Sequence, residues 1–84
     1  MSFAISYDKQ PQHFLKKAEK QIAERIIDKI DILKNGPVPH DAKAIVGYHG
    51  VFRIRVGNHR VLYRINYNDK TIVIVKIDKR GKIY

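Results

Sequence analysis

VFRIRVGNHRVLYRINY, residues 51–67, is the stretch of the chain that decides the fold. Apolar residues alternate with basic ones on both sides of Gly57-Asn58, which is the period of two strands that bury one face. Gly57-Asn58 is a two-residue loop of the kind that joins antiparallel strands in a hairpin. A third β-rich run, residues 71–77, follows turn residues 68–70, so we predict a three-stranded antiparallel meander.

The first half of the chain has the pattern of a strand followed by two helices. Residues 2–7 alternate loosely and predict a first strand, and Pro11 suits the first turn of a short helix. Residues 19–34 carry apolar side chains at spacings of three and four, which predicts an amphipathic helix that ends at Asn35-Gly36-Pro37, where glycine suits a left-handed cap. This order predicts one α+β domain, residues 1–84, with a two-helix hairpin packed on one face of the sheet.

The strand period also assigns the two faces of the meander. The simplest arrangement places the all-apolar alternating sets beneath the helices, and in the third strand that set is Val73, Val75 and Ile77. The opposite face then carries four arginines with apolar residues between them: Arg53, Arg55, Arg60 and Arg64, with Leu62, Ile72 and Ile74. A basic surface with an apolar floor suits a polyanion whose phosphates lie on the arginines.

The charge distribution supports an anionic partner for the second half of the chain. The formal net charge is +9 at pH 7, which is large for 84 residues. Residues 1–41 carry seven lysines and arginines against six acids, whereas residues 42–84 carry ten against two. The excess positive charge therefore coincides with the predicted strands.

Several functional classes are excluded or disfavoured by composition. The chain has no cysteine, which excludes disulfides and thiolate zinc sites and agrees with a cytoplasmic location. We find no apolar run long enough for a membrane span, and residues 1–10 lack the pattern of a signal peptide. The four histidines (His13, His40, His49 and His59) have no metal-like spacing, and we interpret them as surface residues, with His59 as the exception best placed for catalysis. The acids are too few for a two-metal nuclease site, so we expect no metal and no cofactor.

Two basic clusters are candidate binding sites. Arg53 and Arg55 alternate on one strand, and arginines of the same parity follow on the adjacent hairpin strand. Like charges that face each other across a sheet are destabilising without a ligand, which favours an anion site over simple solvation of the face. The second cluster is DKRGKIY, residues 78–84, which is either a basic tail or a continuation of the same surface.

The motifs together resemble the RelE/ParE toxin superfamily over essentially the whole chain. The resemblance rests on residues 44–48, on FRIRVG at 52–57, on HRVLY at 59–63 and on the ending Lys79-Arg80…Ile83-Tyr84. His59 stands where the family usually has an aromatic residue. Some family members also have lysines where Arg53 and Arg55 stand, and arginine stays protonated with a pKa above about 12. The general base is therefore left open.

The resemblance implies a RelE-type toxin, a metal-free endoribonuclease that cuts mRNA in the decoding site of the ribosome and so inhibits translation. The catalytic residues that it implies are Arg53, Arg55, Arg60, Arg80 and Tyr84, and the implied RNA-binding residues are Lys43, Arg64, Lys79 and Lys82. The family also implies a hetero-oligomer with a RelB-like antitoxin that is acidic and partly disordered. Two alternatives remain open, namely a ParE-like inhibitor of DNA gyrase and a non-catalytic nucleic-acid-binding module.

Overall fold

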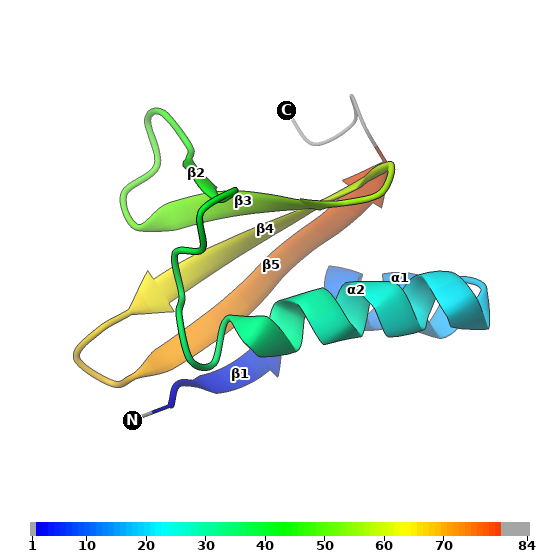
Figure 1. Cartoon of the computed structure of the whole chain (residues 1–84), viewed down its shortest axis with the longest axis horizontal. Helices are drawn as coiled ribbons and strands as arrows, with labels where there is room; N and C mark the ends of the chain where they lie inside the picture. Colours follow the sequence, from blue (N-terminus) through cyan, green and yellow to red (C-terminus); the bar gives the residue numbers. More distant parts are fainter. Residues whose placement is uncertain (1, 80–84) are drawn as a thin grey trace.

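The computed structural model describes residues 2–79, which form one sheet covered by two helices on one side (Figure 1). The elements in chain order are β1 (Ala4–Tyr7), α1 (Lys9–Lys17), α2 (Lys20–Ile32), β2 (Lys43–Ala44), β3 (Val51–Val56), β4 (His59–Asn66) and β5 (Thr71–Lys79). The predicted α+β fold is confirmed, with the N-terminal strand, the two-helix hairpin and the antiparallel meander in the expected order.

The sheet has five strands in the order β1-β5-β4-β3-β2. Strands β3, β4 and β5 form the predicted antiparallel meander, and the two-residue strand β2 pairs antiparallel with the outer side of β3. Strand β1 lies parallel to β5, because the two helices return the chain along the sheet (Figure 1). Gly57 adopts a φ of +61° in the β3–β4 turn, which explains why glycine precedes Asn58 there.

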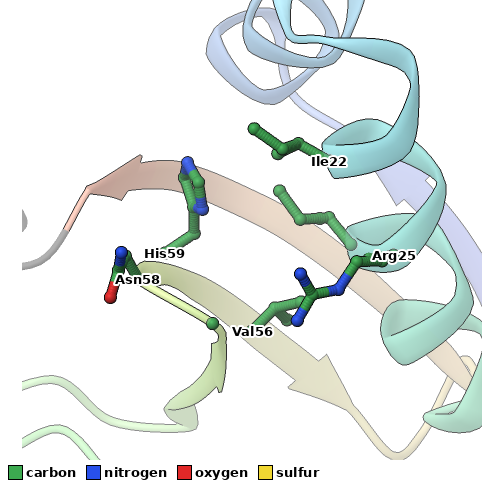
Figure 2. A pocket seen from close by; sticks show the side chains of 7 residues that line it. Ile22, Arg25, Val56, Asn58 and His59 are labelled. Carbon is green, nitrogen blue, oxygen red and sulfur yellow. The ribbon is translucent and has the colours of Figure 1, made fainter.

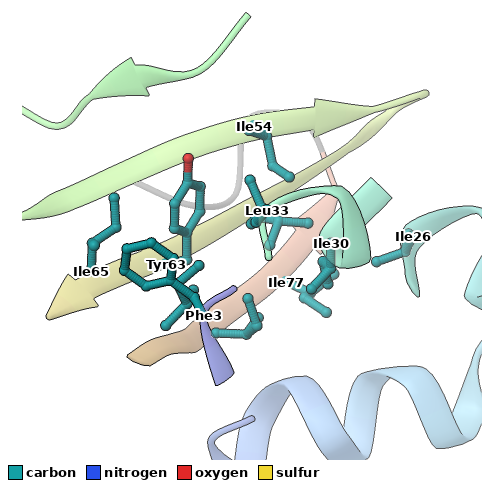
Figure 3. Close-up of a cluster of buried hydrophobic side chains, with 11 residues drawn as sticks. Phe3, Ile26, Ile30, Leu33, Ile54, Tyr63, Ile65 and Ile77 are labelled. Carbon is teal, nitrogen blue, oxygen red and sulfur yellow. The ribbon is translucent and has the colours of Figure 1, made fainter. Parts of the chain in front are cut away.

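The core fills the space between α2 and the sheet (Figure 3). Ile26, Ile30 and Leu33 supply the helical side of the core, as the helical period predicts. The predicted left-handed cap is wrong, because Gly36 does not have a positive φ and α2 ends at Ile32 in a turn. The fully buried Tyr63 ring lies at the centre of the sheet side, and its hydroxyl donates a 2.6 Å hydrogen bond to the carbonyl of Pro37.

The predicted face assignment of the third meander strand is wrong for most of its length. Ile72 and Ile74 are fully buried in the core, whereas Val73 and Val75 lie on the opposite face and are only half-buried. The cause is a β-bulge: Leu62 pairs with Lys76 and Tyr63 pairs with Ile74, so Val75 is an extra residue. The bulge shifts the alternation by one residue, and Ile77 returns to the core as predicted.

The second half of β5 has no strand beside it on the β1 side, since β1 pairs only with residues 71–74. The side-chain amide of Gln10, from α1, takes the place of a neighbouring strand. Its Nε2 donates to the carbonyl of Ile77 at 2.8 Å, and its Oε1 accepts from the amide of Ile77 at 2.9 Å. This pair of bonds satisfies buried backbone groups and fixes α1 against the sheet.

Candidate nucleic-acid interface

The sheet face opposite the helices, called the open face below, carries a grid of basic side chains. Its side chains follow from the register, because directly paired residues point to the same side of a sheet. One row across the strands contains Lys43, Arg53, Leu62 and Lys76, and the rows on either side contain Val51, Arg64 and Val73, and Arg55, Arg60 and Asp78. The described residues of this face thus include six cations and one acid, which gives a strongly positive surface.

The row nearest the β3–β4 turn brings two arginines directly opposite each other. Arg55 pairs with Arg60 across β3 and β4, and Asp78 of β5 pairs with the other side of Arg60. Arg55 is exposed and Arg60 is half-buried. A shallow depression of about 100 Å³ lies between these two arginines and the turn residues Gly57 and Asn58. Two guanidinium groups beside a turn form a suitable seat for one phosphate.

Arg53 lies in the middle row and is half-buried. Its Nε is buried, and within residues 2–79 this atom has no hydrogen-bond partner. A buried donor without an acceptor is costly, so it favours an anion as the missing partner. Lys43 pairs with Arg53 from the edge strand β2 and widens the positive surface on that side.

An apolar groove of about 490 Å³, called the Tyr48 groove below, adjoins the arginines on the open face. Its walls are Ile45, Tyr48, Val51, Leu62 and Val75, with Arg64 and Lys76 as its basic members. The loop between β2 and β3 covers Val51, which is only 6% exposed. The Tyr48 side chain itself is 65% exposed, so an aromatic ring stands at the margin of the groove.

The structure places Lys79 away from the arginines of the open face, whereas His59 also lines the depression between Arg55 and Arg60. His59 and Lys79 are register partners, and both line a hollow on the helix side together with Phe14 and Ile22. The His59 ring packs edge-on against Phe14, with the ring centres 5.5 Å apart. The adjoining hollow has a volume of about 200 Å³. Figure 2 shows Ile22 and Arg25 of α2 on one side of it and Val56 and His59 of the hairpin on the other. The predicted RNA-binding role of Lys79 therefore lacks support from its position.

Of the remaining predicted site residues, one lies on the open face and three lie outside the described part of the chain. Arg64 is exposed on the open face, in the row beside Arg53. Arg80, Lys82 and Tyr84 lie outside the described residues. Within residues 2–79, no cluster of three or more histidines, aspartates or glutamates has the geometry to hold a metal ion. The helices in this range are also too short or too polar to cross a membrane.

Two contacts fix the long connection between α2 and β2, which leads into the open face. One is the hydrogen bond of the Tyr63 hydroxyl to Pro37, and burial raises the pKa of this phenol above its usual range. The other joins Lys29 of α2 to Asp41 at 2.8 Å, and this hydrogen bond lowers the pKa of the Asp41 carboxyl. Both side chains of the ion pair are partly exposed. We therefore expect it to restrict the position of the loop and to contribute little to the free energy of unfolding.

Three residues of the open face were missing from the sequence-based site. Lys76 and Asp78 lie on that face because they alternate with the buried Ile77, and they pair there with Leu62 and Arg60 of β4. Tyr48 enters the site because the loop folds back over β3, and the only signal for that turn was its pair of flanking glycines, Gly47 and Gly50.

Comparison with known proteins gives one consistent group. Residues 5–84 match the family model described as the ParE toxin of type II toxin–antitoxin systems, parDE. A protein of Methanocaldococcus jannaschii assigned as toxin RelE1 is 31% identical over 87 residues, which cover 100% of this chain and 97% of that protein. The toxin chain in the archaeal RelE–RelB complex of Pyrococcus horikoshii has 32% identity and a TM-score of 0.85, covering 98% of this chain and 99% of that one. The RelB–RelE complex of Methanococcus jannaschii gives 32% identity and a TM-score of 0.73, with 93% of each chain covered.

Proposed function

Because this chain belongs to the RelE/ParE superfamily of type II toxin–antitoxin toxins, we propose that it is an endoribonuclease that cuts mRNA in the decoding site of the ribosome. Full-length relatives of the RelE type favour this branch over the gyrase inhibitors. The observation that carries the proposal is the grid of cations on the open face, where Arg53, Arg55 and Arg60 lie on adjacent strands. Inhibition of translation then follows from loss of the message.

The proposed reaction is attack of a ribose 2′-hydroxyl on the adjacent phosphorus. The P–O bond to the 5′-oxygen of the next nucleotide breaks, which leaves a 2′,3′-cyclic phosphate and a 5′-hydroxyl end. The 2′-oxygen loses its proton to a base, and the departing 5′-oxygen gains one from an acid. Negative charge grows on the phosphate oxygens during this exchange, so fixed cations accelerate it, each by about 10²–10³-fold.

The arginines of the open face suit the binding of these phosphate oxygens. Arg55 and Arg60 face each other across two strands, and the sheet fixes their backbones before RNA arrives. Such preorganisation avoids the cost of collecting charges during the reaction. Arg53 adds a guanidinium whose buried Nε lacks an acceptor within residues 2–79. We assign these three arginines to the phosphates.

The proton transfers involve residues whose roles we assign by resemblance. Arg80 is our candidate for contact with the transition state or for protonation of the leaving group, and Tyr84 is our candidate for stacking on an RNA base or orienting it. The general base stays open, because a guanidinium group is poorly suited to accept a proton. The proposed mechanism uses neither a metal ion nor a cofactor.

The partner that we propose is a RelB-like antitoxin, since two toxin structures that share 32% identity with this chain are complexes with RelB. We expect an acidic, largely disordered segment that becomes ordered on this chain and neutralises the arginines. Its apolar residues would cover the sheet edge or the helix hairpin, where the hollow of Figure 2 lies beside Arg25. Masking would keep the basic face from binding RNA until the antitoxin is removed.

One finding favours a second candidate function, namely inhibition of DNA gyrase. The family model that matches residues 5–84 is described as a ParE toxin. A gyrase inhibitor would not cut RNA, and a bare nucleic-acid-binding module would neither cut RNA nor change DNA supercoiling.

Mapping of transcript ends after induction separates these three functions. Expression of the chain in a bacterial host should create new 5′ ends inside translated codons, and untranslated RNAs should stay intact. Arg55→Gln is the matched variant, because it removes a charge from an exposed side chain of the open face. Lys17→Gln, on α1, is the control for loss of charge elsewhere. Intact transcripts together with relaxed plasmids would contradict the proposal and favour the gyrase inhibitor.

A further inference from the structure

The Tyr48 groove is larger than the depression beside Arg55 and Arg60, and phosphate contacts do not explain it. Most of its wall is apolar, and Tyr48 presents more than half of its surface to solvent. Val46, in the same loop, is 96% exposed. An exposed aromatic ring next to an apolar hollow is a common feature of binding sites for flat ligands.

The loop that carries Tyr48 is fixed before any ligand binds. Hydrogen bonds between backbone groups close it at three points: Ile45 to Val51 at 3.0 Å, Tyr48 to Ile45 at 3.2 Å and Ile65 to Gly50 at 3.1 Å. Gly47 and Gly50 adopt φ values of +88° and +74°, a conformation that other residues rarely take. The loop is thus built to hold the ring at one place beside the sheet.

The charge around the groove selects for a polyanion. Its lining contains Arg64 and Lys76 and no acid. Arg53 lies beside it, because Arg53 pairs with Leu62 of the groove floor. A ligand with a flat apolar part and negative charges on both sides fits this arrangement, and single-stranded nucleic acid has both properties.

We propose that the Tyr48 groove holds one unpaired nucleobase of the bound RNA, stacked on the Tyr48 ring, with the flanking phosphates on Arg64, Lys76 and Arg53. This inference rests on the function proposed above and adds a base-binding site to it. Stacking on an aromatic ring tolerates any base, because every base has a π face. The groove would therefore fix the position of the RNA strand and leave its sequence unread.

Binding of a short, fluorescein-labelled single-stranded RNA, measured by fluorescence anisotropy, tests this site. Tyr48→Leu should weaken binding by roughly 10- to 100-fold, whereas Tyr48→Phe should stay within about twofold of the native chain, because it keeps the ring. Tyr67→Leu is the matched control: Tyr67 is 57% exposed, but its ring packs on Phe3, away from the groove. An RNA with one abasic nucleotide should bind the native chain less tightly, and Tyr48→Leu should not distinguish it from intact RNA.

A spectroscopic signal reports on the ring itself. The chain has five tyrosines and no tryptophan, so tyrosine emission is not obscured. In a Tyr84→Phe background, RNA should quench this emission through stacking on Tyr48, and the further change Tyr48→Phe should remove that quenching. A role of Tyr48 in folding alone would leave the quenching unexplained.

The outcomes separate this inference from the proposed function. If Tyr48→Leu cuts and binds RNA as the native chain does, the base-binding site is refuted and the nuclease stands. If the variant loses affinity only for the purified antitoxin, the groove binds a protein and the inference is again refuted. If the native chain neither binds nor cuts RNA, the proposed function and the inference both fail.

Discussion

Two adjacent substitutions in β5, Ile74→Asp and Val75→Asp, should lower the stability by very different amounts. Ile74 is fully buried in the core, whereas Val75 is the extra residue of the bulge and lies half-buried on the open face. A strand without the bulge would place Val75 in the core and Ile74 outside. The pair therefore tests the bulged register of β5 against β4.

The expected cost of Ile74→Asp comes from two losses. Removal of a buried isoleucine side chain costs about 2–5 kcal/mol. The new carboxyl has no partner and becomes neutral, and protonating a group of ordinary pKa about 3.9 at pH 7 adds about 4 kcal/mol. The domain itself has a free energy of unfolding of only about 4–13 kcal/mol, from the usual range per residue. Ile74→Asp should therefore unfold the chain or nearly so.

Val75→Asp should lower the free energy of unfolding by only about 1 kcal/mol, as is usual for a partly exposed position. The new carboxylate would lie among cations, since Lys76 is adjacent in sequence and Arg64 lines the same groove. Urea denaturation followed by far-UV circular dichroism measures both variants at equal concentration. A native midpoint for Ile74→Asp, or an unfolded Val75→Asp, would refute the bulged register.

Three further predictions concern the site, the buried phenol and the partner. Arg80→Ala should abolish growth arrest at an unchanged melting temperature, and full toxicity of the well-expressed variant would remove Arg80 from the site. Burial raises the pKa of Tyr63, so the folded chain keeps a proton that the unfolded chain releases near the ordinary value of 10.0. The contribution of this group to the free energy of unfolding should thus be constant below pH 10 and fall above it, by up to about 1.4 kcal/mol per pH unit. Urea titrations across this pH range should show no such fall for Tyr63→Phe. The same pH dependence in the variant and the native chain would contradict the burial of an ionisable phenol. For the antitoxin, the association rate measured by stopped flow should fall as salt rises, because charge steers the encounter. The affinity measured by calorimetry should largely persist, because buried apolar area stabilises the complex. An equal fall in the association rate and in the affinity would argue against an apolar contribution.

The sequence predicted the faces of β3 and β4 because both strands are regular. Alternation in FRIRV and in HRVLYRI places Arg53, Arg55, Arg60 and Arg64 on one side, and the register confirms that they share a face. The alternation of β5 failed because nearly every residue from Ile72 to Val75 is apolar, so either parity gives an apolar set. Only the pairing with β4 distinguishes the two, and that pairing depends on contacts between distant residues.

Other parts of the site depend on tertiary contacts that a local pattern cannot contain. Gln10 replaces a strand at Ile77, which is 67 residues away along the chain. Tyr48 belongs to the site because its loop folds over β3, and a turn with two glycines is consistent with many loop directions. His59 was the best-placed histidine in the sequence, yet its ring packs on Phe14 of α1. The alternation within a strand does not indicate which helix will pack against it.

Reconstitution with purified ribosomes tests the central claim most directly. A programmed ribosome with an empty acceptor site, an end-labelled mRNA and the purified chain should yield one cut inside the acceptor-site codon. The upstream fragment should end in a 2′,3′-cyclic phosphate, and Arg55→Gln should cut about 10²–10³-fold more slowly if Arg55 holds a reacting phosphate. An mRNA that stays intact on ribosomes loaded with the native chain would contradict the assignment of the open face as a ribonuclease site.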